Sequence, residues 1–253
     1  MSPLNLASTR LNTIEHRRLM PELVVFDLIG TLVHDGGAVA RFLTAACLRA
    51  GIAASLDDVQ SRWNFGHTIR NILTITALPK ILSLDSDRPV AAIVRGIEED
   101  FRPRIQYHLR TSDEAREVPG ASRVLHTLHE AGVRVVIGSR LDLETCHGLM
   151  DRFGWHQNHL VGDVISLEEE NEMLEESCLP AFPSMTGNPL GPNEAQIAKV
   201  CATPLSVTSG CAANCKWVIA ALFDSQGESG FQPHHPTHTM NHLDDLSDIV
   251  LAS

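Results

Sequence analysis

Short apolar segments stand out at three places along the chain, and the first of them is unbroken. The first run, Leu23 to Phe26, ends at Asp27, and the second, Val133 to Ile137, leads to Ser139. A third run covers residues 160 to 165. Continuous apolar runs of this length are typical of parallel strands that are buried on both faces. The pattern therefore predicts a parallel sheet with Asp27 and Ser139 at the carboxyl ends of two of its strands.

The part of the chain after residue 165 is less regular. The pattern predicts a short helix over Glu194 to Cys201 and two further strands, Leu205 to Thr208 and Trp217 to Phe223. The acidic run from Glu168 to Glu176 predicts a solvated loop or helix face. The segment from Pro180 to Pro192 is rich in proline and glycine and predicts a loop.

Between the first two strands the pattern is helical. Val39, Phe42 and Leu43 recur at helical spacing, as do Ile69 and Ile72 further along. A strand, a helical insert, a helix and a second strand together imply a parallel sheet. We therefore expect an α/β protein whose Rossmann-like core, residues 20–35 and 117–253, is interrupted by a helical cap, residues 36–116. Residues 1–20 are expected to be an N-terminal extension.

Composition narrows the classes of partner. A formal net charge of −11, with no compensating basic stripe, argues against binding nucleic acid or anionic lipid. The sequence also lacks an apolar run of eighteen or more residues, so we expect no membrane span. A small-molecule substrate is the expected partner. Without a recognisable signal peptide, we expect a cytoplasmic protein whose six cysteines stay reduced.

The segment around Asp27 resembles a known motif. Val24-Val25-Phe26-Asp27-Leu28-Ile29-Gly30-Thr31-Leu32 is similar to the first motif of the haloacid dehalogenase superfamily. Further similarity lies in Pro119-Gly120, in Ile137-Gly138-Ser139 and in Thr237 to Leu246, so that the resemblance spans nearly the whole chain. Within the superfamily, the phosphonatase-like subgroup is the most similar, on Ala38 to Gly51, Asp57 to Leu73 and Phe153-Gly154-Trp155.

The resemblance implies a role for each matching residue. Asp27 would be the nucleophile that forms a covalent aspartyl intermediate. Ser139 would hydrogen-bond an oxygen of the transferred group. Gly30 and Thr31 would lie beside the substrate. The cap would select the substrate, and it would also support a homodimer.

The sequence departs from the family at the general acid. Phosphatases of the family carry a second aspartate where this chain has Ile29, and that acid is worth roughly 10²- to 10⁴-fold in rate. Phosphonatases also lack this acid but use a lysine of the cap, whereas the cap segment from Phe65 to Arg70 has none. In this chain, Arg70 of that segment and Arg140 after the second strand are the candidate cations for substrate binding.

The third and fourth motifs of the family are also incomplete. The third normally supplies a lysine or arginine, whereas the best local match, Gly187-Asn188-Pro189, offers asparagine. The fourth normally supplies carboxylates for magnesium, whereas Val207 to Asn214 contains none. A magnesium cofactor would then be held by Asp27 and the backbone at Ile29, too few oxygen ligands for tight binding.

The missing cations matter because phosphoryl groups are anionic. Two like charges about 4 Å apart cost about 4 kcal/mol at an effective dielectric constant near 20. Lys199, Lys216 or Arg140 could offset this repulsion, although each is expected to be a surface charge. Haloacid dehalogenases need no metal and place serines in the fourth motif, which Thr208-Ser209 resembles.

Two clusters could in principle bind a metal. The first is Cys201, Cys211 and Cys215, and the second is His234, His235, His238 and His242. Neither has the paired spacing of a zinc site, so we expect thiol packing for the first and a surface loop for the second.

Two classes of function follow. The retained Asp27, Gly30, Thr31 and Ser139 favour a weakly active phosphonatase-like hydrolase that acts on a small phosphorylated or related acid. The absent acidic fourth motif favours a non-catalytic descendant that binds a ligand or a protein. A metal-independent 2-haloacid dehalogenase is a third hypothesis.

Overall fold

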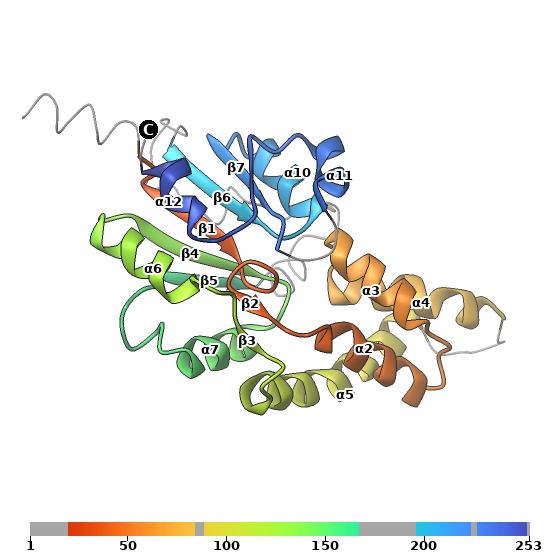
Figure 1. The fold of residues 1–253 in the computed structure, drawn as a ribbon. Coiled ribbons are helices and arrows are strands. Elements are labelled where there is room, and N and C mark those ends of the chain that lie inside the picture. Colours follow the sequence, from red (N-terminus) through yellow and green to blue (C-terminus); the bar gives the residue numbers. More distant parts are fainter. Residues whose placement is uncertain (1–19, 84–88, 167–195, 224–226, 252–253) are drawn as a thin grey trace, which may run out of the picture.

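A six-stranded parallel sheet forms the centre of the computed structural model, which describes residues 20–83, 89–166, 196–223 and 227–251 (Figure 1). The strand order is β5-β4-β1-β6-β7-β8. The strands are β1 (Leu23–Asp27), β4 (Arg134–Ser139), β5 (Asp163–Ser166), β6 (Ile197–Cys201), β7 (Trp217–Ala221) and β8 (His238–Met240). The predicted α/β fold with a Rossmann-like parallel sheet is confirmed.

Both faces of the sheet are buried, which explains the continuous apolar runs. Val24 and Phe26 of β1 belong to one hydrophobic cluster, whereas Leu23 and Val25 belong to another. Alternate residues of a strand point to opposite faces, so each face has its own core. The first cluster includes residues of α6 (Ala121–Glu130), α7 (Leu143–Arg152) and α12 (Asp245–Val250). The second includes residues of α10 (Pro204–Ala212) and α11 (Gly227–Phe231), which the short 3-10 helix η2 (Gln232–His234) follows.

A helical insert separates β1 from β4. It contains α2 (Ala38–Arg49), α3 (Leu56–Phe65), α4 (Ile69–Ser83) and α5 (Val90–Thr111). It is flanked by the two short strands β2 (Val33–His34) and β3 (Arg116–Glu117), which pair antiparallel. The predicted helical periodicity is thus present in the structure, and we call α2–α5 the cap. Its status as a separate folding unit stays a prediction.

Two predicted elements are wrong. Ile197–Cys201 is a buried strand rather than part of a helix, and Pro204–Ala212 is a helix rather than a strand. Lys199 interrupts the apolar run of the strand, which obscured it. The start of the helix had a recognisable signal, because Thr203 caps it and Pro204 occupies its first turn.

Some predictions lie outside the described residues. They concern the N-terminal extension up to residue 19, the acidic run 168–176 and the loop 180–192, which includes the third-motif candidate Gly187-Asn188-Pro189. In the part of the chain that the structure describes, no helix has the length and hydropathy needed to cross a bilayer.

Candidate active site

Asp27 ends strand β1, and a tight glycine turn follows it. The backbone leaves the sheet directly after this residue, where Leu28 N donates to Gly138 O at 3.1 Å. Gly30 has φ +91°, and a Cβ built on it would lie 2.7 Å from Cβ of Ala202. Glycine is therefore required here, both for the backbone conformation and for the close approach of residue 202.

Two neutral donors hold the Asp27 carboxylate. Oδ2 accepts a hydrogen bond from the backbone N–H of Ala202 at 2.8 Å, and Oδ1 accepts one from Ser206 Oγ at 2.8 Å. Ala202 directly follows β6, and Ser206 lies in the first turn of α10. The N-terminal end of a helix also favours a negative charge. The carboxylate is thus fixed in orientation by both of its oxygens.

The two other hydroxyl groups predicted for the site support its loops. Thr31 is fully buried, and its Oγ1 donates to the backbone carbonyl of Asp27. Ser139 is 4% exposed at the end of β4, beside β1, and its Oγ accepts from Leu141 N at 3.1 Å. A hydroxyl that accepts in this way keeps its own hydrogen to donate to another acceptor. The structure thus places Ser139 and Asp27 at the ends of neighbouring strands.

Arg140 joins the sheet to the cap. Its NH1 donates to the backbone carbonyls of Trp63 at 2.7 Å and of His67 at 3.0 Å. The guanidinium also stacks on the Trp63 ring, 3.5 Å from the centroid. In this state of the cap, Arg140 binds protein groups at the cleft. Its predicted contact with substrate stays a prediction.

Arg70 makes an ion pair inside the cap. Its Nε and NH2 lie 3.2 and 3.1 Å from the two carboxylate oxygens of Glu98, a buried residue of α5. This bidentate geometry is among the stronger forms of ion pair. A substrate would have to compete with Glu98 for Arg70.

The C-terminal end of α3 closes over the edge of the sheet at which Asp27 lies. A Cβ at Gly66 would lie 2.7 Å from Thr203 Oγ1 and 2.8 Å from Leu205 Cβ, on the loop between β6 and α10. The ring of Phe65 packs edge-on against that of His234, with centroids 5.9 Å apart. Both contacts join the cap to the loop and helices that follow β6, so the described residues form a closed arrangement at this edge of the sheet.

A hollow of about 690 Å³ runs along α3. The described residues that line it are mostly polar: Asp57, Asp58, Gln60, Ser61, Arg62, Asn64, Phe65 and His67. Burial lowers the pKa of His67, and the charges of Arg62 and Arg140 lower it further. His67 therefore favours its neutral form near pH 7, so the cap presents a neutral imidazole on this hollow.

The groups around Asp27 fit a magnesium ion poorly. Magnesium requires oxygen lone pairs in near-octahedral geometry, whereas Ala202 N–H and Ser206 O–H direct hydrogens at the carboxylate. Ile29, bridged to Val33, has only backbone oxygen to offer. Over the described ranges, no three His, Cys, Asp or Glu side chains form a group that could hold a metal. We therefore derive no step through magnesium.

The structure corrects the position of the fourth motif. Strand β6 pairs with β1 on the side opposite β4. The residues that contact Asp27 from this side are Ala202 and Ser206, not the stretch from Val207 to Asn214. The corrected stretch, Ala202-Thr203-Pro204-Leu205-Ser206, also contains no carboxylate. Sequence reasoning missed both contacts, although the helix-start signal at Thr203-Pro204 would have located them.

The three candidate cations differ in their placement. Lys199 is only 5% exposed, so its assignment as a surface charge is wrong. Arg140 is half-buried at the cap, also unlike a surface charge. Lys216 is exposed, with its Nζ 4.1 Å from the centroid of the Trp217 ring. Lys199 alone of the three lies in the sheet next to β1.

The cysteine and histidine clusters show packing and hydrogen bonds. Cys201 and Cys215 are buried free thiols, and Cys211 is an exposed one. His234 Nδ1 lies 2.8 Å from Thr208 Oγ1. These contacts agree with the structural roles expected from the sequence.

Comparison with known proteins gives a fold but no close relative. No protein-family model matches the chain, and no curated protein does. Solved structures match over nearly the whole chain. A predicted phosphoglycolate phosphatase from Haemophilus somnus is 16% identical, with a TM-score of 0.68 over 90% of this chain and 97% of its own.

Two other solved structures agree. CbbY from Rhodobacter sphaeroides, in complex with phosphate, is 17% identical with a TM-score of 0.63, covering 90% of this chain and 96% of its own. A haloacid dehalogenase-like hydrolase from Streptococcus pneumoniae is 14% identical with a TM-score of 0.62, covering 92% and 99%. The chain therefore has the fold of haloacid dehalogenase-like proteins, as the resemblance of its motifs implied.

Proposed function

We propose that the protein is a hydrolase that acts through Asp27 on a small phosphorylated or related acid. The observation that carries this proposal is the Asp27 carboxylate, fixed by Ala202 N–H and Ser206 O–H at the end of the central strand and beneath the cap. Two of the structurally similar proteins support the phosphorylated class, since one is a predicted phosphoglycolate phosphatase and the other binds phosphate.

The chemistry would proceed in two steps. A lone pair of an Asp27 oxygen attacks the electrophilic atom, the bond to the leaving group breaks, and an ester or acyl phosphate forms on Asp27. Water then cleaves this intermediate and restores the carboxylate. The two donors keep the carboxylate oriented for attack, which reduces the entropy lost in reaching the transition state. The Ser139 hydroxyl can donate to an oxygen of the transferred group.

The substrate must have a good leaving group. With Ile29 in place of an acid, this position cannot protonate a departing alkoxide. Acyl phosphates and aryl phosphates leave as weakly basic anions and do not need that proton. We therefore expect such substrates to be hydrolysed faster than alkyl phosphates.

A second candidate reaction is displacement of halide from carbon. The neutral donors on Asp27 favour it, because a nucleophile without a metal ion suits a substrate without a phosphoryl dianion. The remaining alternative is a non-catalytic binding protein, which the closed contact of Arg140 with the cap favours. All three retain the same fold and differ in what happens at Asp27.

Isotope labelling separates these functions. The protein is incubated in excess over acetyl phosphate, p-nitrophenyl phosphate or 2-chloropropionate in H₂¹⁸O, with and without magnesium, and Asp27→Asn is the control. Phosphoryl transfer places ¹⁸O in phosphate and depends on Asp27. Displacement at carbon places ¹⁸O in the Asp27 carboxylate, which peptide mass spectrometry detects. A non-catalytic protein gives neither label, and turnover that survives Asp27→Asn contradicts the proposal.

A further inference from the structure

Lys199 is a charged residue in the interior of the protein. Among the residues that the structure describes, Glu98 and Lys199 are the charged residues that are buried. Glu98 pairs with Arg70 inside the cap, whereas Lys199 lies in the middle of β6. Burying a cation is unfavourable unless neighbouring groups stabilise it, so the surroundings of Lys199 must do so.

The neighbouring helix is built to accept the lysine stem. A Cβ at Gly210 of α10 would lie 3.2 Å from Lys199 Cδ and 3.2 Å from Val218 Cγ1. Glycine in a helix interior is less favourable than alanine, and here it makes room for the stem. The ammonium group donates to Ser209 Oγ, and Ser209 Oγ in turn donates to the carbonyl of Ser206 at 3.1 Å.

Lys199 and Asp27 lie on the same face of the sheet and contact the same helix. Lys199 is in register with Val25, and Asp27 is the next residue of β1 on that face. From strand spacing and rise, the two Cα atoms are about 8 Å apart, and the four-carbon stem of lysine can shorten the distance between the charges. Lys199 binds Ser209 while Asp27 binds Ser206, one helical turn earlier.

The charges of Lys199 and Asp27 both affect the pKa of the Cys201 thiol. Burial is the main cause that raises its pKa; the ammonium of Lys199 acts against this rise, and the carboxylate of Asp27 adds to it. Lys199 also acts on the thiols of Cys211 and Cys215, whose pKa values burial raises so that they stay neutral. Lys199 is therefore a positive charge that acts on the same buried region as the nucleophile.

We propose that Lys199 is a positioning residue of the active site. Its buried charge stabilises the Asp27 carboxylate from the interior of the sheet, and its contact with α10 holds the first turn of that helix against Asp27. The role in catalysis rests on the proposed function, whereas the pairing of the two charges does not. A positive charge at this place would also offset the repulsion between Asp27 and an anionic substrate, in a site that fits a magnesium ion poorly.

A double-mutant cycle tests the pairing without activity. The unfolding equilibrium in urea is measured for wild type, Lys199→Met, Asp27→Asn and the double variant. If the charges interact, the two changes together should cost less stability than the sum of the single changes. The folding equilibrium constant of the double variant should then be about tenfold larger than additivity predicts. The control cycle uses Lys216→Met, which removes an exposed lysine, and should be additive. If Lys199→Met does not fold, Lys199→Gln replaces it.

Phosphate binding tests the role toward an anion. In calorimetry with inorganic phosphate, Lys199→Met should bind at least about tenfold more weakly, Lys199→Arg should stay near wild type, and adding Asp27→Asn to Lys199→Met should restore most of the loss. If Lys199 had only a structural role, Asp27→Asn would not restore the phosphate affinity of the Lys199→Met variant. Additive effects in both measurements overturn the proposal. If the effects of the Lys199 and Asp27 changes are coupled but no turnover depends on Asp27, the interaction between the two charges is retained and the proposed function is rejected.

Discussion

The Arg140 guanidinium lies 3.5 Å from the centroid of the Trp63 ring and joins the end of strand β4 to helix α3 of the cap. Two hydrogen bonds to cap carbonyls strengthen this contact, at 2.7 and 3.0 Å. Because the contact joins the residue after β4 to the cap, it favours the closed arrangement of cap and sheet. The contact is thus the most direct target for opening the site.

Arg140→Ala should loosen the cap. Loss of the stacking and of both hydrogen bonds should lower the free energy of unfolding by about 1–3 kcal/mol and raise amide exchange in α3 more than in the sheet. Hydrogen exchange followed by mass spectrometry measures this. Arg123→Ala is the matched control, because it removes an exposed ion pair with Asp244 that is worth at most about 1 kcal/mol. Equal exchange in α3 of both variants would contradict the role of Arg140.

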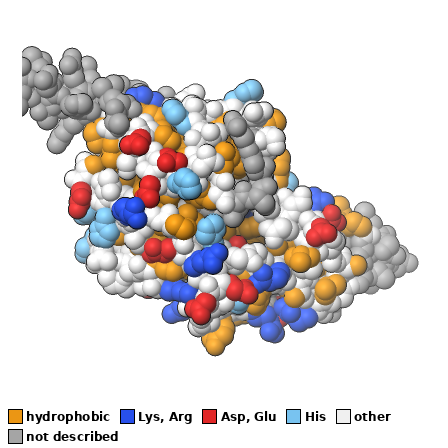
Figure 2. All heavy atoms as spheres, in the orientation of Figure 1, with side chains coloured by type: hydrophobic (Ala, Val, Ile, Leu, Met, Phe, Trp, Pro, Cys, Tyr) orange, Lys and Arg blue, Asp and Glu red, His pale blue; other side chains and the backbone are white. Residues whose placement is uncertain are grey.

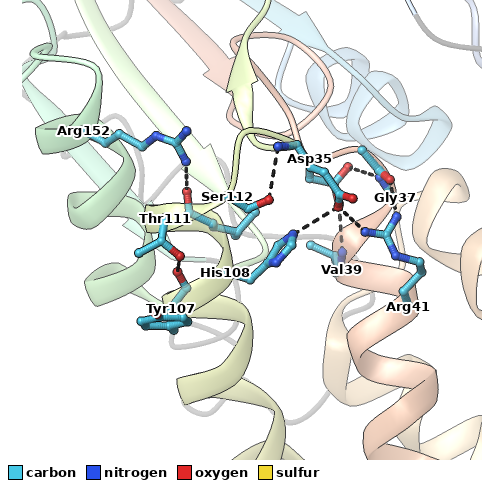
Figure 3. Close-up of polar contacts among 12 residues, drawn as sticks. Asp35, Gly37, Val39, Arg41, Tyr107, His108, Thr111, Ser112 and Arg152 are labelled. Carbon is cyan, nitrogen blue, oxygen red and sulfur yellow. Dashed lines mark hydrogen bonds and ion pairs between the residues drawn. The ribbon is translucent and has the colours of Figure 1, made fainter.

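Limited proteolysis tests the division into cap and core. The chain enters the cap around Gly37 and leaves it near Ser112. Figure 3 shows the side chains of Arg41 and His108 where these two segments meet. Glu114 holds this junction by an ion pair to Arg41 and by a contact with His108, whose Nε2 lies 3.3 Å from Glu114 Oε2. We expect early cuts near residues 36 and 116, faster in Glu114→Gln, and two products that retain their own helices or sheet. Cuts within α2 or β4 at the same rate would argue against two units.

The pKa values of the buried thiols predict loss of stability at high pH. Burial raises the pKa of Cys47 and of Cys215 from 9.0 to about 11. The unfolded chain releases these protons first, so the native state binds more protons and the free energy of unfolding must fall between about pH 9 and pH 11. Urea denaturation across this range measures the slope. Cys47→Ala should reduce it, and an unchanged slope would show that Cys47 does not contribute.

Ser139 and Asp27 should differ in their effect on any turnover. Asp27→Asn removes the nucleophile and should abolish the covalent step, whereas Ser139→Ala removes one donor, worth about 10²- to 10³-fold. Initial rates with acetyl phosphate compare the two variants with wild type. We expect slow turnover of generic phosphate esters throughout. A Ser139→Ala variant as inactive as Asp27→Asn would point to a larger role for the serine.

The sequence predicted the parts of the fold that depend on long regular patterns. The apolar run before Asp27 and the helical periodicity between Val39 and Ile72 identified the central strand and the cap helices. Strand β6 was missed because Lys199, a residue rarely buried, interrupts its apolar run. Periodicity cannot reveal such a buried charge, since its tolerance depends on Gly210 of a helix that comes later in the chain.

The place of Asp27 at the end of a strand was predictable, but the groups that contact its carboxylate were not. Asp27 follows from its place at the end of a buried strand. Ala202 and Ser206 reach it only because β6 pairs with β1, a long-range relation that a single sequence does not state. Because the pattern predicts a helix where β6 lies, the fourth motif was sought at Val207 to Asn214, several residues after the true strand end at Cys201.

Ser206→Asp should create a magnesium site that wild type lacks. The change replaces the hydroxyl donor 2.8 Å from Asp27 Oδ1 by a second carboxylate, so that two groups of oxygen ligands face each other. Without metal, the like charges should destabilise the variant, and magnesium should restore its stability. Calorimetry should report millimolar or weaker affinity for wild type and at least about a tenfold gain for Ser206→Asp. Asp27→Asn in the same background should remove the gain, because one carboxylate is again too few. If Ser206→Asp binds magnesium no better than wild type, the donor at residue 206 is not what sets the metal affinity of Asp27.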